Sequence, residues 1–479
     1  MRVLFATNHL GKLRHFPTVI CGLAQRGHDV TIAVEGDATR TSLRLCRCHP
    51  PYPVVTAPAR RSDAWAPYMG GLRTVRDYVR FLGPELGGAV AVAERARDWA
   101  YLEAPRLVTA LERSRLLRRN LAAADTAARL VENIVPSDPG HEAFLARHTP
   151  DVVLVTPIIE FGSSQPDIVK SAHRLGIPVA YLPFSWDNLS SKGLIRVIPD
   201  RVLVWNDIQR DEAVRWHEVP PDQIVVTGAP RFDEFWKLEP SIGRQDYLRS
   251  MGFEQDTPIV LLLGSSPLVA PDELLMVSEW LQALRNGPGD IAAANVLLRP
   301  HPKNLAQWEA AAFEDERTRI HRVDSLKNVE QPLYDTLHHS AVVVGVNTSA
   351  LLEAAVVGRS VHAPPPVNGT ARSFGRTLHE RYLSAEGALL VSSASFAEHV
   401  AQLDAVAAGP SYDSERSTAF ARSFLRPHGL DREVSPIMTD EIERLGAARK
   451  TPAVPPAWQR PVGAAVRALL RAGLAPGTV

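Results

Sequence analysis

The sequence predicts an α/β protein built from two Rossmann-like, doubly wound domains that face a cleft. Short runs rich in Val and Leu recur without period-two alternation, which is typical of parallel strands buried on both faces. Helical segments separate these runs, and the alternation starts again near residue 259, so two successive α/β sheets are expected. A chain of 479 residues also exceeds what one hydrophobic core usually covers.

The first forty residues are predicted to form a βαβ unit. Residues 3–6 and 30–34 have the composition of buried strands, and residues 17–26 have that of a helix ended by Gly27. Pro and Arg crowd residues 49–66, which indicates a loop.

A helical excursion is expected at about residues 85–146, where Ala, Arg, Leu and Glu dominate, and we expect it to cover the acceptor side. The first domain, residues 1–240, then continues with a helix around residues 167–175 and with strands at 151–156, 179–182, 202–205 and 224–227.

The second domain is predicted to span residues 250–440. It should contain strands at 259–263, 296–298 and 341–344, a helix at 272–284, and a later helix closed by Gly358. Residues 451–479 read as a Pro-rich linker followed by a short amphipathic helix.

Polar residues follow three strands of the second domain. Arg299-Pro300-His301-Pro302 comes after one strand, Ser265-Ser266 after another, and Asn347-Thr348-Ser349 after a third. Ligands bind open α/β sheets at the carboxyl ends of strands, and a helix amino end favours phosphate oxygens. Glu353, six residues beyond Asn347, could accept ribose hydroxyls. Each piece alone is more often a loop or capping feature, but together they favour a nucleotide-diphosphate site.

The same residues resemble a known superfamily. The layout resembles the two-domain GT-B glycosyltransferases, and the second half is similar to the group of CDP-glycerol glycerophosphotransferases and UDP-N-acetylglucosamine 2-epimerases. Residues 299–302 resemble the His-Pro motif of the former, and residues 347–358 resemble the epimerase helix that holds phosphate and ribose. Residues 226–233 resemble the segment that leads into the second domain in this group. The resemblance implies acceptor binding by the first sheet, nucleotide binding by the second, and reaction in the cleft.

The sequence also departs from these families. Glycerophosphotransferases carry Trp-His-Gly six residues before a Lys; here Trp186 and Lys192 keep that spacing, but Asp187 replaces the His. The Gly-Asp-Thr and His-Val-Glu-Ala-Gly segments of epimerases are missing from residues 155–160 and 182–185. Epimerase activity is therefore not expected.

Three residues are candidates for the base that takes the proton of an acceptor hydroxyl. A carboxylate partly removed from water can serve as a base near neutral pH, and Asp187, beside Trp186 at a strand end, is the first choice. The alternative for Asp187 is an Asx turn. His15 is the second candidate, although His15 or Lys12 could instead face phosphate, and Glu160 is the third.

Composition excludes some classes of function. Lys plus Arg (53) equals Asp plus Glu (53), so no basic surplus suggests a nucleic acid partner. Three cysteines are too few for a disulfide framework, and no signal peptide or membrane span is evident, which favours a reducing cytoplasmic setting. No Asp-x-Asp pair follows a strand, so no metal or other cofactor is expected.

These observations lead to one functional prediction. The chain is expected to be a metal-independent glycosyltransferase that moves a sugar from a nucleotide donor to a hydroxyl of a surface polysaccharide, a lipid-linked glycan or a small natural product. The alternatives are a CDP-glycerol-type glycerophosphotransferase and a catalytically silent nucleotide-sugar-binding partner protein. The last helix has Arg460, Arg467 and Arg471 on one face and apolar residues on the other, so weak contact with the inner membrane surface is a further expectation.

Overall fold

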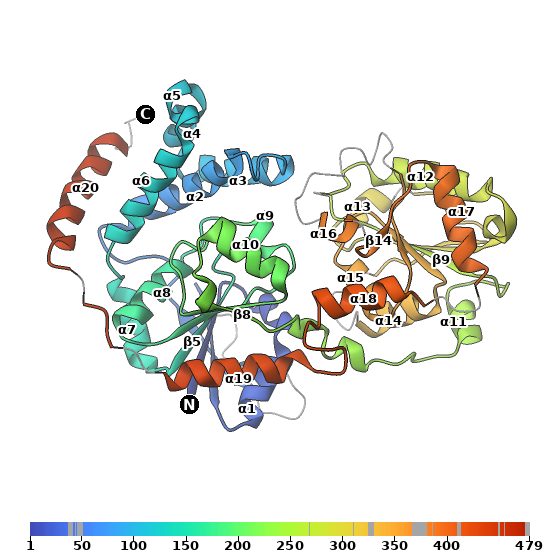
Figure 1. The fold of residues 1–479 in the computed structure, drawn as a ribbon, viewed down its shortest axis with the longest axis horizontal. Coiled ribbons are helices and arrows are strands. Elements are labelled where there is room, and N and C mark those ends of the chain that lie inside the picture. Colours follow the sequence, from blue (N-terminus) through green and yellow to red (C-terminus); the bar gives the residue numbers. More distant parts are fainter. Residues whose placement is uncertain are drawn as a thin grey trace. The chain divides into compact units, whose positions relative to one another are not determined.

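The computed structural model describes residues 1–36, 42–43, 45, 51–267, 269–309, 311–323, 330–365, 381–385, 387–409, 413–448, 451–454 and 456–474. It divides into two compact units, residues 1–231 with 426–479, and residues 232–425. Each unit contains its own sheet (Figure 1).

The first unit is built on a sheet with the strand order β3-β4-β2-β1-β5-β6-β7-β8 among the described residues. All its strand pairs are parallel except β3 with β4. The strands are β1 (Arg2–Thr7), β2 (Asp29–Glu35), β3 (Ser42–Leu43), β4 (Tyr52–Ala57), β5 (Val152–Thr156), β6 (Val179–Tyr181), β7 (Arg201–Val204) and β8 (Ile224–Val226).

Helices cover both faces of the first sheet, as the buried, non-alternating strands predict. Along β1, Val3 and Phe5 pack with α1 (Pro17–Gln25), whereas Leu4 and Ala6 lie in the core on the opposite face. That second core also takes side chains from α7 (Pro139–His148), α8 (Gln165–Arg174) and α10 (Asp207–His217). The doubly wound arrangement is thus confirmed for this unit.

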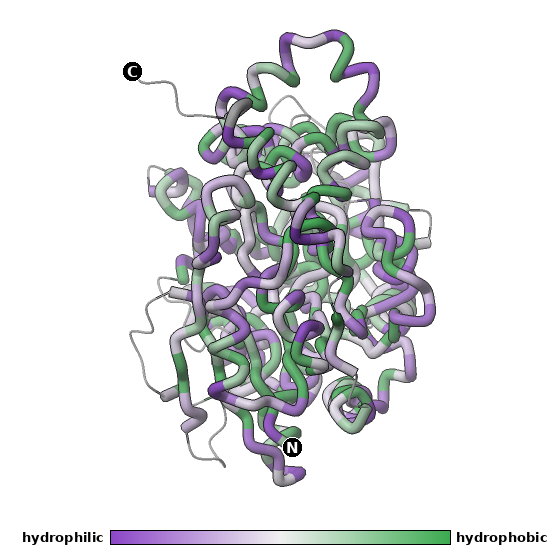
Figure 2. Tube along the Cα trace, turned by 90° about the vertical axis from the view of Figure 1, so that its left-hand side faces the viewer, coloured by the Kyte–Doolittle hydropathy of each residue, from purple (hydrophilic) through white to green (hydrophobic). Residues whose placement is uncertain are grey.

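The helical excursion begins earlier than predicted. The helices are α2 (Ala66–Leu82), α3 (Val90–Glu103), α4 (Pro105–Arg113), α5 (Arg115–Arg119) and α6 (Leu121–Ile134). The expected loop at residues 49–66 is also wrong, because β4 lies within it and pairs with β2. Figure 2 shows hydrophobic and hydrophilic residues alternating along the helices, as expected of helices with one buried face.

The second unit is built on a parallel sheet of order β11-β10-β9-β12-β13-β14 among the described residues. Its strands are β9 (Ile259–Leu263), β10 (Asn295–Arg299), β11 (Thr318–Ile320), β12 (Val342–Gly345), β13 (Val361–His362) and β14 (Leu390–Val391). The helices are α11 (Arg244–Ser250), α12 (Glu273–Arg285), α13 (Leu305–Trp308), α14 (Glu330–His339), α15 (Ala350–Val356), α16 (Arg381–Ser384), α17 (Phe396–Ala407) and α18 (Glu415–Phe424). On one face, Trp280 of α12 and Leu403 of α17 pack on β9, β10 and β12.

The predicted end of the second domain at residue 440 is wrong. The chain returns to the first unit at Arg426, and α19 (Val434–Ala447) packs beside α1 (Figure 1). Met438, Ile442 and Leu445 of α19 belong to the same core as Val3 and Phe5. The passage into the second unit also comes earlier than residue 240, between Arg231 and Phe232.

The last helix, α20 (Gln459–Leu474), packs on the first unit. Val466 and Leu470 lie against a small core that includes Trp65, and the guanidinium of Arg467 lies 5.8 Å from the Trp65 ring centre. The predicted division into one cationic and one apolar face is therefore wrong, because Arg467 shares the packed face while Leu469 is 73% exposed. Among the described residues, no helix is both long and apolar enough to span a bilayer.

Candidate functional site

Three adjacent strands of the first sheet bring the predicted catalytic residues to one edge. The registers of β1 with β5 and of β5 with β6 align Thr7 with Thr156 and Val155 with Tyr181. The segments that follow these strand ends carry His15, Glu160 and Asp187 respectively. Because parallel strands end at the same edge, these three segments meet there.

Glu160 is held by two neighbours. Lys12 Nζ lies 2.7 Å from its Oε1, and Asn8 Nδ2 donates to its Oε2 at 2.5 Å. Burial raises the pKa of Glu160, but the hydrogen bond and charge of Lys12, with the Asn8 hydrogen bond, outweigh burial, so the net pKa is lowered. An ionised carboxylate with both oxygens engaged is a poor proton acceptor, and its position suits a residue that orients Lys12.

His15 is buried and neutral. Burial lowers its pKa well below the ordinary value, and the charges of Arg231, Arg14 and Lys12 act in the same direction while Asp187 opposes them. Its ring lies 5.2 Å from the Phe184 ring, and its Nδ1 has no hydrogen-bond partner within the described part of the chain. A neutral imidazole with an unsatisfied buried nitrogen is suited to a polar contact with a ligand.

Asp187 precedes the short helix α9 (Asn188–Ser191) and is partly exposed. Its Oδ2 accepts a hydrogen bond from Ser191 Oγ at 2.6 Å. The turn is closed by a different side chain, because Asn188 Oδ1 accepts from the backbone N–H groups of Phe184 and Ser185 at 2.8 and 3.2 Å. Because these donors precede Asn188 in the chain, the contact is not an Asx turn; it holds the loop that leads to Asp187.

The charge of Asp187 affects the pKa of two further residues. Burial lowers the pKa of Lys192, and Asp187 counteracts this; burial raises the pKa of Tyr181 well above its ordinary value, and Asp187 adds to that shift. Lys192 was predicted only as part of the motif spacing, and Tyr181 was not predicted as a site residue. A Tyr at the last position of a buried strand was the available signal.

The second sheet brings its own polar segments to one edge. β10, β9 and β12 are adjacent, and Leu263 at the end of β9 aligns with both Arg299 and Gly345. The loops that follow contain His301, Ser265-Ser266 and Asn347–Ser349. A Cβ at Gly264 would lie 2.9 Å from the backbone nitrogen of His301, so glycine is needed there for the β9 and β10 ends to approach.

Glu273 is a buried carboxylate that was not predicted from the sequence, and it holds the loops at this edge through hydrogen bonds. Glu273, the first residue of α12, accepts from the Ser265 N–H at 2.5 Å, from Trp308 Nε1 at 2.9 Å and from Asn304 Nδ2 at 3.3 Å. Burial nonetheless raises the pKa of Glu273 to about 7. The Ser265 hydroxyl is buried without a partner in the described residues. The sequence feature that could have identified Glu273 is an acidic residue in the first turn of a helix, just after a pair of Ser residues at a strand end.

His301 is oriented by its own loop. The Lys303 backbone N–H donates to His301 Nδ1 at 3.0 Å, so the proton of the neutral ring is on Nε2. Burial, with a smaller effect of Lys303, lowers the pKa of His301. The ring thus offers an N–H donor that can serve a phosphate oxygen.

Comparisons with known proteins address the fold. No family model matches the chain, and no curated protein matches its sequence significantly. A UDP-GlcNAc 2-epimerase structure from Methanocaldococcus jannaschii is 11% identical with a TM-score of 0.51, and the match covers 93% of this chain and 100% of that one. A putative UDP-N-acetylglucosamine 2-epimerase from Listeria monocytogenes is 11% identical with a TM-score of 0.50, covering 95% and 99%. The fold is of the GT-B type. At these identities the similarity shows the fold and not the activity.

The remaining predicted residues of the second unit differ in exposure. Arg299 Nη1 lies 3.2 Å from His321 Nδ1 and 3.3 Å from Thr336 Oγ1, and burial lowers its pKa, so its guanidinium is engaged behind the edge. Asn347 and Glu353 are buried, whereas Ser349 is exposed.

The structure also bears on the cysteines and on possible metal ligands. Cys21 is disulfide-bonded, which the low cysteine count did not lead us to expect. Cys46 and Cys48 lie outside the described residues. Within the described ranges, no three His, Cys, Asp or Glu side chains are grouped to hold a metal ion.

Proposed function

We propose that the protein is a glycosyltransferase that moves a sugar from a nucleotide donor to a hydroxyl acceptor, without a metal ion. The observation that supports this proposal is that the two sheets carry different chemical groups at their edges. The first sheet edge presents a partly exposed carboxylate, Asp187, beside Lys12 and Lys192, and the second presents neutral N–H and hydroxyl donors at the ends of central strands.

The donor nucleotide is proposed to bind the second unit. His301 Nε2–H is assigned to the pyrophosphate, with Ser265, Ser266 and Asn347–Ser349 on its oxygens and Glu353 on the ribose. Hydrogen bonds between such donors and an anionic leaving group strengthen as charge develops, which is how a transferase without a metal can stabilise the departing diphosphate. Arg299 is proposed to support this edge from behind, since His321 and Thr336 engage it.

Asp187 is proposed as the base that takes the acceptor proton. It is accessible, whereas His15 is 5% exposed and Glu160 is paired with Lys12. We assign His15 a polar contact with the substrate and Glu160 the positioning of Lys12. The acceptor classes considered remain a surface polysaccharide, a lipid-linked glycan and a small natural product. The proposed location remains the cytoplasm, and the disulfide bond of Cys21 is the one observation against it, since disulfides are rare there.

A thermal-shift panel tests this proposal. UDP-, GDP-, dTDP- and CMP-sugars and CDP-glycerol are added to the full chain, because a ligand that binds only the folded state raises the unfolding temperature. A shift with one nucleotide sugar that is reduced in His301→Ala supports the proposal. His338→Ala is the matched control, since His338 is near the end of α14, which leads into the amino end of β12, whereas the proposed site follows the carboxyl end of that strand. No shift with any sugar nucleotide contradicts it.

Two alternatives are separated by the same panel. The Trp186 to Lys192 spacing favours a glycerophosphotransferase, whereas Asp187 in place of that family's His argues against one. A glycerophosphotransferase would respond to CDP-glycerol instead of a sugar nucleotide. A nucleotide sugar that binds but is neither transferred to any acceptor class nor hydrolysed would instead indicate a silent binding partner.

A further inference from the structure

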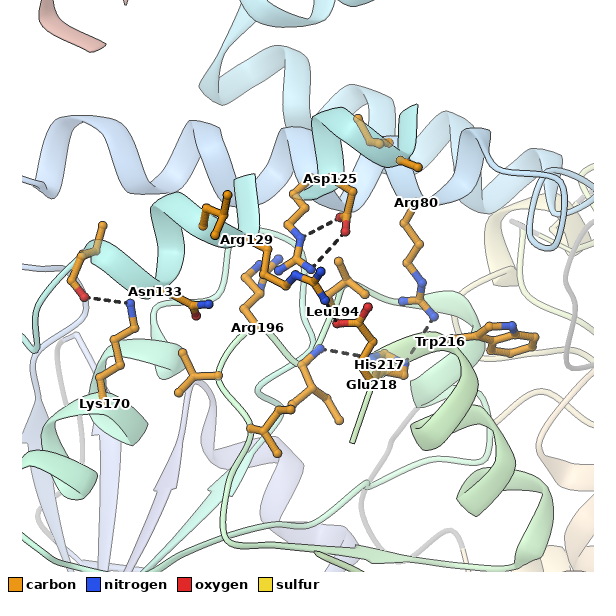
Figure 3. Close-up of a pocket in the computed structure, with 18 of the residues that line it drawn as sticks. Arg80, Asp125, Arg129, Asn133, Lys170, Leu194, Arg196, Trp216, His217 and Glu218 are labelled. Atoms are coloured by element: carbon orange, nitrogen blue, oxygen red, sulfur yellow. Dashed lines mark hydrogen bonds and ion pairs between the residues drawn. The ribbon is translucent and has the colours of Figure 1, made fainter. Parts of the chain in front are cut away.

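A large cavity lies within the first unit, apart from the proposed catalytic edge. Its volume is about 1390 Å³, and helices α2 and α6 line one side while α10 and residues 194–198 line the other (Figure 3). Residues of the segment before α20, such as Ala453 and Val454, complete the wall. Asp187, His15 and Glu160 are not among the lining residues, so the cavity is a separate feature.

The cavity wall is strongly cationic. Nine of its lining residues are Arg or Lys, and only Asp125 and Glu218 carry carboxylates. Some of these cations are paired: Arg76 Nε lies 2.7 Å from Asp125, and Lys170 Nζ lies 2.6 Å from Glu132. Positive charge nevertheless exceeds negative charge along the wall, which favours an anionic occupant.

Two arginines on the wall, the partly exposed Arg80 and the buried Arg196, have buried nitrogen atoms without a partner in the described part of the chain. Arg196 is paired with Asp77 through Nη2, but its Nε and Nη1 have no partner in the described part of the chain. Its side chain is fully buried. Arg80 donates to the carbonyl oxygens of Lys192 and Gly193 at 2.8 and 2.9 Å, yet its Nε also lacks a partner there. These unpaired nitrogen atoms are buried from solvent, so the two guanidinium groups act on the cavity through their positive charge and not through direct contact.

Apolar groups share the same wall. Val79 of α2, Leu121 and Leu130 of α6, and Leu194 and Ile198 of the opposite segment all line the cavity. A small inorganic anion would leave these surfaces against water. Apolar burial is favourable in proportion to area, so the occupant that fits this wall has an apolar body as well as an anionic group.

We propose that this cavity binds a phosphate ester of an apolar alcohol, with the phosphate beside Arg118 and Arg119 of α5, in the positive field of Arg80 and Arg196, and the apolar chain along the leucines. A phosphate monoester carries close to two negative charges and three acceptor oxygens, which matches several arginine forks better than one carboxylate does. This site goes beyond the proposed glycosyl transfer and does not depend on it.

Three probes separate the contributions of charge and chain in the full-length protein. Farnesyl phosphate has both, farnesol has only the chain, and inorganic phosphate has only the charge. Equilibrium titration should show saturable binding of farnesyl phosphate at least about tenfold tighter than either of the others. Farnesol or inorganic phosphate binding equally well would overturn the assignment, as would no binding of farnesyl phosphate.

Matched variants locate the binding. Arg118 and Arg119 line the cavity, whereas Arg115 lies on the same helix, α5, outside it. Arg118→Glu with Arg119→Glu should weaken farnesyl phosphate binding about tenfold or more, and Arg115→Glu should not. All three side chains are exposed, so the substitutions leave the core intact.

A steric pair gives a second, charge-independent test. Ala122 lines the cavity and its neighbour Ala123 does not, although both are exposed on α6. Ala122→Trp should weaken binding and Ala123→Trp should leave it near wild type. Wild-type affinity in Ala122→Trp and in the Arg118/Arg119 double variant would place the ligand elsewhere and overturn the proposal.

Discussion

At the scale of single residues, the first prediction concerns Asp187 as the proposed base. Asp187→Asn keeps the shape of the side chain and removes its basicity, so turnover should fall about a hundredfold or more while donor affinity barely changes. Steady-state kinetics with the donor identified by the thermal-shift panel measure both quantities. Near-normal turnover in this variant would exclude Asp187 as the base.

The second prediction concerns the contribution of Glu273 to the free energy of unfolding. Glu273→Gln should lower the free energy of unfolding by about 1 to 3 kcal/mol, because one acceptor oxygen becomes an amide nitrogen among the N–H donors of Ser265, Trp308 and Asn304. Urea denaturation near pH 5 measures it. Glu279→Gln is the matched control, since Glu279 is an exposed glutamate of the same helix. Equal stability of wild type and Glu273→Gln would remove Glu273 from the support of this edge.

The pH dependence of that difference follows from the raised pKa of Glu273, about 7 against an ordinary 4.5. Between these values the folded state binds more protons than the unfolded state. The contribution of Glu273 is therefore fully present below about pH 4.5 and is lost as the pH rises through about 7. The stability difference between wild type and Glu273→Gln should shrink over this window, and a difference that grows with pH would contradict the assignment.

Residue identities were more predictable than residue environments. Strand ends followed by Ser, His or Asn could be read from the sequence, because chain order and strand order fix where they meet. The burial of Glu273 and the pairing of Lys12 with Glu160 could not, because both depend on side chains that approach from elements distant in the chain.

At the scale of elements, local composition failed where tertiary contacts decide. β4 contains Pro53 and follows a Pro-rich stretch, which indicates a loop, yet Tyr52 and Val54 are buried and the strand pairs with β2. The apolar spacing of Met438, Ile442 and Leu445 predicts a helix but not the sheet on which it packs. The same limit applies to α20, whose packed face includes Arg467 beside Trp65.

The packing of α20 predicts different effects at two neighbouring leucines. Leu470 lies against the small core with Trp65, whereas Leu469 is 73% exposed. Leu470→Asp should detach the helix and increase hydrogen exchange over residues 459–474, and Leu469→Asp should not. Equal exchange in the two variants would mean that the helix does not dock through this face.

Membrane contact by α20 stays a prediction, and the exposed apolar residues Val462 and Leu469 are those that could make it. Liposome co-sedimentation of wild type, Leu469→Asp and a deletion of residues 452–479 tests it. If neither change reduces co-sedimentation on anionic vesicles, the membrane contact should be dropped.

At the scale of the whole molecule, each sheet has one edge suited to ligands, and the two edges differ in chemistry. The first combines carboxylates with lysines, and the second combines neutral donors with a glycine that lets two strand ends approach. After completing the second unit, the chain returns to the first unit through α19. The N-terminal and C-terminal segments therefore belong to the same unit. Because the proposed nucleotide contacts all lie in the second unit, the nucleotide should stabilise that unit selectively.

Hydrogen exchange of the full chain with and without a nucleoside diphosphate tests that selectivity. Protection should concentrate in residues 264–266, 300–302 and 346–353, because these segments supply the proposed donors. His301→Ala should lower nucleotide affinity by roughly ten- to a hundredfold, since a hydrogen bond to a charged group is lost. Glu353→Gln should have a smaller effect, because an amide of the same shape still offers one acceptor oxygen. Protection that maps instead to residues 1–235, or wild-type affinity in both variants, would overturn the site assignment and most of the proposed function.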